Sequence, residues 1–168
     1  MFTQSTRQLK MSNKPLRPPG SQGEDFFLAS CIRCGKCAQA CPYRSIKVAT
    51  FLDGLVMMGT PYIKARDIPC YVCMKCPPVC PSGALNRKLQ KKDVLMGTAS
   101  LDRKTCLPWQ GTLCRSCYEN CPVFDEAIVM DDELRPVINE KKCIGCGICE
   151  NVCPVDPTAV TVKARDSK

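Results

Sequence analysis

Cysteine is the residue type with the clearest capacity for chemistry in this 168-residue sequence, which contains 16 of them. The cysteines fall into four groups, and each group ends in a Cys-Pro pair. The groups that begin at Cys31, Cys70 and Cys143 share the spacing C-x₂-C-x₂-C-x₃-C-P. The remaining group has seven residues between Cys106 and Cys114 and then resumes that spacing. The sixteen residues are Cys31, Cys34, Cys37, Cys41, Cys70, Cys73, Cys76, Cys80, Cys106, Cys114, Cys117, Cys121, Cys143, Cys146, Cys149 and Cys153.

This spacing is typical of bacterial ferredoxins that bind two [4Fe–4S] clusters. Three closely spaced thiolates surround one cluster, and the cysteine before the proline reaches the other cluster of the pair. Four clusters need sixteen thiolates, which is the number in the chain. We therefore predict four [4Fe–4S] clusters, with all sixteen cysteines as iron ligands.

Two other uses of cysteine compete with this prediction. Structural zinc sites also use C-x₂-C pairs, but they need neither a third cysteine two residues further on nor a closing Cys-Pro. A disulfide framework is possible in a small secreted chain. The regular groups of four favour iron–sulfur clusters over both.

Composition narrows the functions further. The sequence has no histidine, which excludes imidazole-ligated haem, Rieske clusters and Ser-His-Asp catalysis. The formal net charge is +8 with every thiol neutral. Four oxidised clusters with their thiolates contribute about −2 each, so the holoprotein is close to neutral. The basic excess then balances metal charge and does not predict nucleic-acid binding.

Catalysis and membrane insertion find no support in the sequence. No apolar run is long enough to span a bilayer, so no transmembrane segment is expected. No glycine-rich dinucleotide loop accompanies the cysteines. We therefore expect no catalytic residues in this chain, and a substrate-converting site only in partner subunits.

Each cysteine group is expected to lie in a small repeat of strand, ligand loop, helical turn and strand. We predict a short helix over Glu24–Ser30 and strands at Ile46–Ala49 and Val160–Val162. Two repeats make one dicluster module, so the predicted fold class is α+β, with two bacterial ferredoxin-like modules. Residues 1–23, rich in proline and glycine, predict an extended N-terminal arm. Residues 24–162 form the four-cluster domain, and residues 163–168 a basic tail.

The chain resembles the NapG/MauM family of ferredoxin-type proteins over residues 16–162. The resemblance rests on Leu16-Arg-Pro-Pro-Gly20, on Gly59-Thr-Pro-Tyr-Ile-Lys-Ala-Arg-Asp-Ile-Pro-Cys70 and on the interrupted group from Cys106 to Cys121. It implies a four-cluster electron-transfer subunit of a hetero-complex. The implied partners are a membrane-bound quinol-oxidising subunit and a downstream reductase. An accessory role, supplying electrons for cofactor assembly in another enzyme, is the alternative.

Resemblance to four-cluster redox subunits also implies a nested pairing of the groups. One module then combines residues 24–50 with 132–162, and the other spans residues 51–131. Cys153 completes the cluster of Cys31, and Cys41 that of Cys143. Cys121 completes the cluster of Cys70, and Cys80 that of Cys106. Sequential pairing, of the first group with the second and the third with the fourth, is the alternative.

The compartment is a further expectation. Family members carry a twin-arginine export signal, and the N-terminus of this sequence has neither Arg-Arg nor an apolar region. The chain as it stands is expected in the cytoplasm or at the cytoplasmic face of a membrane. A periplasmic location is the alternative if such a signal has been removed.

Overall fold

The computed structural model describes residues 14–165, so the expected arm and tail lie partly outside the described residues. Short helices and short strands alternate along this part of the chain, as the predicted α+β class requires. The helices are α1 (Glu24–Ser30), α2 (Lys36–Gln39), α3 (Ser116–Glu119) and α4 (Ile148–Asn151). The strands are β1 (Ile46–Val48), β2 (Pro61–Ile63), β3 (Gly97–Leu101), β4 (Ile128–Met130), β5 (Pro136–Ile138) and β6 (Val160–Ala164).

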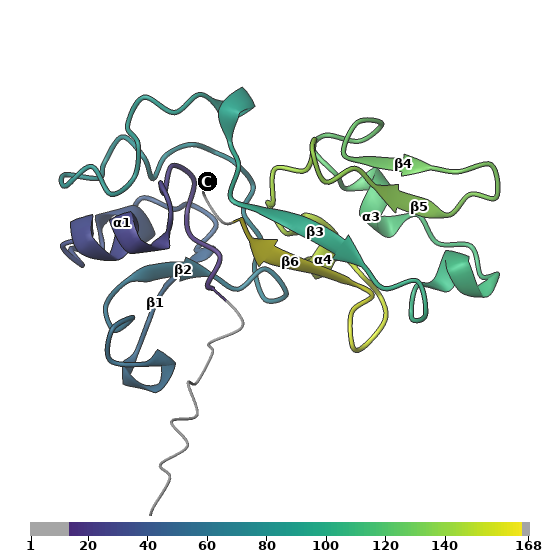
Figure 1. Ribbon diagram of the computed structural model, residues 1–168, viewed down its shortest axis with the longest axis horizontal. Coiled ribbons are helices and arrows are strands. Elements are labelled where there is room, and N and C mark those ends of the chain that lie inside the picture. The colour runs from purple at the N-terminus through teal and green to yellow at the C-terminus, as the bar shows by residue number, and fades with distance from the viewer. Residues whose placement is uncertain (1–13, 166–168) are drawn as a thin grey trace, which may run out of the picture.

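The strands form three antiparallel pairs that divide the chain into two consecutive modules (Figure 1). The first module, residues 14–96, contains the β1–β2 pair, in which Ile46 lies opposite Ile63. The second module, residues 97–165, contains β3–β6 and β4–β5. The long β3–β6 ladder joins the first strand of the second module to its last.

Helix α1 begins and ends where the sequence predicts. Gly23 lies at its N-cap, and Glu24 and Asp25 occupy the first turn. Their carboxylates face the positive end of the helix dipole, which stabilises this end. The helix buries Phe27, whose side chain is 1% exposed, against the core of the first module. The predicted strands at Ile46 and Val160 are also confirmed, as β1 and β6.

The residues just before α1 are extended, but they do not form a separate arm. Leu16 bridges to Ile63 beside β2, and Ser21 bridges to Leu85. Leu16 is buried in the first core together with Phe27. Residues 14–23 therefore belong to the first module, because their apolar side chains complete its core.

The nested arrangement of modules is wrong. It requires residues 24–50 to fold with residues 132–162, yet β1 pairs with β2 inside the first module. The two strands follow one another in the sequence, and consecutive strands usually pair or lie next to each other. The modules are consecutive, which was the alternative arrangement.

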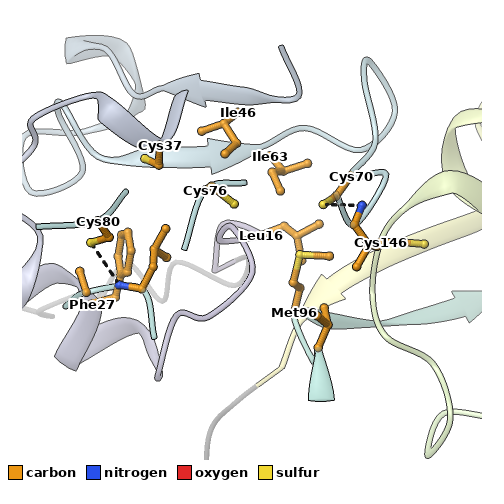
Figure 2. Packing of buried hydrophobic residues seen from close by; sticks show 14 of the residues in the cluster. Leu16, Phe27, Cys37, Ile46, Ile63, Cys70, Cys76, Cys80, Met96 and Cys146 are labelled. Carbon is orange, nitrogen blue, oxygen red and sulfur yellow. Dashed lines mark hydrogen bonds between the residues drawn. The ribbon is translucent and has the colours of Figure 1, made fainter. Parts of the chain in front are cut away.

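Two clusters of buried side chains form the core, and cysteines are prominent in both. The first combines Phe27, Leu85 and Ile63 with five buried cysteines. The second centres on Ile128, Val160, Cys143 and Cys149. Figure 2 shows the first cluster and reveals that Cys146, from the second module, belongs to it. The two modules are therefore packed together through a ligand loop.

Candidate metal centres

The sixteen cysteines line four separate cavities, with four cysteines around each. Site A is lined by Cys31, Cys34, Cys37 and Cys80; site B by Cys41, Cys70, Cys73 and Cys76; site C by Cys121, Cys143, Cys146 and Cys149; site D by Cys106, Cys114, Cys117 and Cys153. The four cavities are similarly small, at about 10–20 Å³ each. Four thiols around each cavity is the number that one [4Fe–4S] cluster needs.

The donor set of each cavity fits a [4Fe–4S] cluster better than zinc or disulfides. All sixteen thiols are free, so no disulfide framework is present. Within residues 14–165, no group of three or more Cys, Asp or Glu side chains is spaced to hold a single metal ion. The thiols instead surround an open volume, and soft thiolates are the usual ligands of iron–sulfur clusters.

The ligand loops share an unusual backbone conformation around their second cysteine. In the first group, Arg33 and Gly35 flank Cys34 with φ values of +55° and +70°. The equivalent pairs are Val72 with Met74 in the second group, and Gly145 with Gly147 in the fourth, all with positive φ. A positive φ at the β-branched Val72 is strained, and such strain is characteristic of functional sites. The loops are therefore held in a shape that points their thiols inward.

The third group departs from this conformation as well as from the spacing. Arg115, which follows Cys114, has φ of −128°, and a 3₁₀ turn over Leu107–Gln110 occupies the longer gap. This turn still brings Cys106 to site D, where it is buried. The irregular loop thus supplies three thiols to its site, as the regular loops do.

Burial controls the protonation of the central thiols. Desolvation raises the pKa of Cys70 to about 12, and the neighbouring Cys146 thiolate of the other module adds to this rise. Desolvation also raises the pKa of Cys37, Cys117 and Cys146 to about 11. Without metal these thiols are neutral at pH 7, so cluster binding must release their protons.

Two of the Cys-Pro cysteines, Cys80 and Cys153, have a lowered pKa. Burial acts to raise the pKa of Cys80, but donors from the Leu85 amide and from Ser82 outweigh it and lower the pKa. At Cys153 burial is likewise outweighed, here by the Thr158 hydroxyl and by backbone amides. The Ser82 Oγ lies 3.7 Å from the Cys80 sulfur. Sites A and D therefore each receive one thiolate stabilised by a hydroxyl group.

The nested ligand assignment fails at all four Cys-Pro cysteines. Cys80 lines the cavity of Cys31, and Cys41 lines that of Cys70. Cys153 lines the cavity of Cys106, and Cys121 that of Cys143. The Cys-Pro cysteine of each group lines the cavity formed by the other group of the same module. This follows because the strands that carry the two groups belong to one module.

Several arginines make contacts near the sites that the cysteine spacing does not predict. Arg66, between β2 and the second group, donates from Nη1 to the carbonyl oxygens of Glu150 and Cys153 at 3.0 and 2.8 Å. Arg87 donates to the Cys80 carbonyl at 2.6 Å. Arg17 is 4% exposed and pairs with Glu24. Only the arrangement of the chain brings these cations to backbone carbonyls and to a buried carboxylate.

The largest aromatic residue lies outside the cavities. The Trp109 ring is contacted by the guanidinium groups of Arg103 and Arg135, each 4.3 Å from a ring centroid. Its Nε1 donates to the Pro136 carbonyl at 3.3 Å. Trp109 thus packs the long loop of the third group onto β5. The residues that line site D there are Leu107, Pro108 and Pro136.

Within residues 14–165, no helix has the length and apolar character needed to cross a membrane.

Comparison with known proteins agrees with the geometry of the sites. Residues 30–84 and residues 99–161 each match a 4Fe-4S dicluster domain family. These two segments coincide with the two modules, and each contains the cysteines of two cavities. The chain therefore has two dicluster domains whose sixteen cysteines match four [4Fe–4S] clusters.

The relatives extend over most of the chain. It is 44% identical to the ferredoxin-type protein NapG of Escherichia coli (strain K12), over 91% of this chain and 72% of that protein. It is 39% identical to the methylamine utilization ferredoxin-type protein MauM of Methylorubrum extorquens, over 94% of this chain and 76% of that protein. The resemblance found in the sequence motifs is confirmed by both relatives.

Proposed function

Because the chain belongs to the NapG/MauM family of ferredoxin-type proteins, we propose that it carries electrons between subunits of a redox complex. The donor in this proposal is a membrane-bound, quinol-oxidising subunit, and the acceptor is a downstream oxidoreductase. The coarser statement, that the chain is a ferredoxin-type electron carrier with 4Fe-4S domains, follows directly from its family and its two dicluster domains.

The observation that carries the proposal is the division of sixteen cysteines among four cavities, with four cysteines around each. A [4Fe–4S] cluster bound by four thiolates accepts and releases one electron and has no free position for a substrate. We infer that the four cysteines lining each of sites A to D are the ligands of one cluster. The role of the chain is then to hold, space and shield these groups.

The lining side chains exclude water from the cavities. Site C is bordered by Ala99, Val123, Ile128 and Val162, which are apolar. Site D is bordered by Leu107, Pro108 and Val155. Burial and hydrogen bonds to sulfur are the means by which a protein sets the potential of a cluster. The apolar lining of site C in particular supports electron transfer.

The direct test is reduction of the protein by quinol in its native membrane. Membranes that contain the protein with its partners are treated anaerobically with duroquinol, and the reduced clusters are followed by EPR. The proposal predicts reduced-cluster signals that disappear when the chain is deleted and return when it is restored. Failure of quinol to reduce the clusters, with the clusters intact, would contradict the proposed donor.

The accessory role is distinguished from the electron-carrier role by removing the chain after its target enzyme has matured. If the chain supplied electrons only for cofactor assembly, its removal after maturation of the target enzyme would leave electron flow unchanged. We predict that degrading the chain in mature cells stops quinol-dependent electron flow at once. Continued flow would favour the accessory role.

We place this activity on the cytoplasmic side of the membrane. Protease treatment of intact spheroplasts should therefore leave the chain uncut. Cleavage under these conditions would instead indicate a periplasmic location.

A further inference from the structure

One contact between the two modules joins a segment of each, and both segments carry cysteine ligands; a second contact joins Met96 to Ile144, whose carbonyl accepts from the Met96 N–H at 3.0 Å. In the first module the segment is residues 65–70, which ends at Cys70 of site B. In the second it is residues 146–155, which begins at Cys146 of site C and includes Cys153 of site D. The Cys70 N–H donates to the Cys146 carbonyl at 2.9 Å. The first of these contacts is therefore also the contact between sites B and C.

Side chains from both modules clamp this contact. The Arg66 guanidinium donates to carbonyl oxygens at the end of α4 and in the loop beyond it, at Glu150 and Cys153. In return, the Asn151 amide donates to the carbonyl oxygens of Arg66 and Asp67 at 2.9 and 3.1 Å. The exchange is reciprocal, so a relative shift of the modules breaks hydrogen bonds on both sides.

Glycine makes the approach possible at Gly147. A Cβ atom at this position would lie 2.3 Å from the Cβ of Ala65, which is closer than two carbon atoms can pack. Gly35 occupies the same place in the first ligand loop, at the N-cap of α2, as Gly147 does at the N-cap of α4. Both have positive φ, but a Cβ at Gly35 would meet nothing within 4 Å. The positive φ favours glycine in both loops, although Met74 occupies the equivalent position of the second loop. Of the two glycines, only Gly147 lies at a close approach of the modules.

Sites A and B are neighbours inside the first module, and sites C and D are neighbours inside the second. Cys37 of site A and Cys76 of site B lie in one core cluster with Cys70 and Cys146. In Figure 2, Cys80 and Cys37 lie on one side, Cys76 and Cys70 in the middle, and Cys146 beyond Cys70. In the second module, α3 with Cys117 of site D packs against α4 with Cys149 of site C. The contacts thus follow the order A, B, C, D.

We propose that the Ala65–Gly147 contact and the reciprocal hydrogen bonds of Arg66 and Asn151 set the separation of sites B and C. These contacts join two dicluster modules into a single row, with sites A and D at its ends. The inference rests on the proposed electron-carrier function, because the row matters only if the four sites hold clusters. It assigns Arg66 and Gly147 a role in spacing the sites, although neither residue is a ligand.

The test compares Gly147→Ala with Gly35→Ala. The two variants impose a similar backbone cost, since both replace an N-cap glycine of positive φ, but only Gly147→Ala introduces a clash with the other module. Two readouts are used on the anaerobically purified full chain. One is hydrogen exchange of the Cys70 amide, and the other is the set of distances between reduced sites from pulsed dipolar EPR.

For Gly147→Ala we expect about tenfold faster exchange at Cys70, the effect of losing one hydrogen bond. We also expect the B–C distance to lengthen while the A–B and C–D distances stay constant. Gly35→Ala should change neither readout. The double variant Ala65→Gly/Gly147→Ala removes the clashing atom and should restore both, as a coupled pair does.

The outcomes separate this inference from the proposed function. A wild-type chain without iron would overturn the proposed function itself. A chain that binds its iron, but in which Gly147→Ala gives the same exchange and distances as Gly35→Ala, would overturn the positioning role alone. If Gly147→Ala does not assemble, Arg66→Gln takes its place. It should release the same amide and lengthen the same distance, and unchanged values would contradict the inference.

Discussion

Hydroxyl groups near sulfur atoms distinguish the ends of the row from its centre. Ser82 lies beside Cys80 of site A, whereas in site D the Cys114 thiol donates to the Ser116 hydroxyl at 3.7 Å. Thr158 lowers the pKa of Cys153, also in site D. Site C is lined by apolar side chains and backbone, whereas site B is also lined by Ser45, whose hydroxyl donates to the Pro69 carbonyl at 2.6 Å, and by two tyrosines. A hydroxyl donor stabilises negative charge on sulfur, so it favours the reduced state of the bound cluster.

The first prediction concerns the potential of site A. Replacing Ser82→Ala removes the hydroxyl beside Cys80 and should lower the potential of this one site, because the additional electron loses a stabilising donor. Potentiometric titration followed by EPR measures the four potentials. The control is Ser100→Ala, at an exposed position of β3. An unchanged set of potentials in Ser82→Ala would show that the hydroxyl does not tune the site.

The second prediction concerns an ion pair near the start of the described chain, in which Arg17 is 4% exposed and Glu24 13% exposed. Arg17 donates from Nε to Glu24 at 2.8 Å and from Nη1 to the Thr60 hydroxyl and the Pro61 carbonyl. Removing one partner leaves the other buried without compensation. Arg17→Met should therefore reduce the free energy of unfolding by about 3 kcal/mol.

Chemical denaturation of the holoprotein under anaerobic conditions measures this loss. The double variant Arg17→Met/Glu24→Gln should lose less than the sum of the two single variants, since it leaves no uncompensated charge. A single Arg17→Met variant as stable as the wild type would mean that the pair contributes nothing to the first module.

At the scale of elements, local features follow from the sequence and long-range pairing does not. Helix α1 is predictable because Glu24 and Asp25 mark its first turn and Phe27 its buried face. The ligand sets of three cysteines are predictable because the loop spacing alone determines them. The origin of each fourth ligand depends on which strands share a module. Short segments such as Ile46–Val48 carry no signal of that partner.

The third prediction tests the pairing of the groups. With sequential pairing, Cys106 and Cys153 belong to one cluster, so the double variant Cys106→Ala/Cys153→Ala should lose one cluster and retain about twelve iron atoms. Cys31→Ala/Cys153→Ala damages sites A and D together and should retain about eight. Iron analysis of the purified variants measures both. Nested pairing requires the opposite result, with the greater loss in the Cys106 variant.

For the whole molecule, the small organic core makes folding dependent on the clusters. Aromatic residues are 6% of the sequence, and cysteines occupy much of both core clusters. When metal ligation supplies part of the folding free energy, its removal unfolds the chain. The contacts between modules were beyond sequence-based prediction for a related reason. The approach of Gly147 to Ala65 joins positions far apart in the chain, and glycine in a ligand loop already has a local explanation.

The fourth prediction follows from this dependence. Anaerobic removal of iron by a chelator should abolish the circular dichroism of the folded chain and expose both modules to protease. In any compact state that persists after iron removal, desolvation raises the pKa of the buried thiols, so these thiols become protonated. Adding ferrous iron and sulfide with a reductant should restore the fold, and reductant alone should not. A stable, protease-resistant apoprotein would contradict the prediction.

The central claim is that each of the four cavities holds a [4Fe–4S] cluster. The most direct measurement is iron and sulfide analysis of anaerobically purified protein, combined with Mössbauer spectroscopy. We expect about sixteen iron and about sixteen sulfide per chain, all in [4Fe–4S] form. Bound zinc, disulfide-linked cysteines, or an iron content well below four clusters in the intact chain would contradict it.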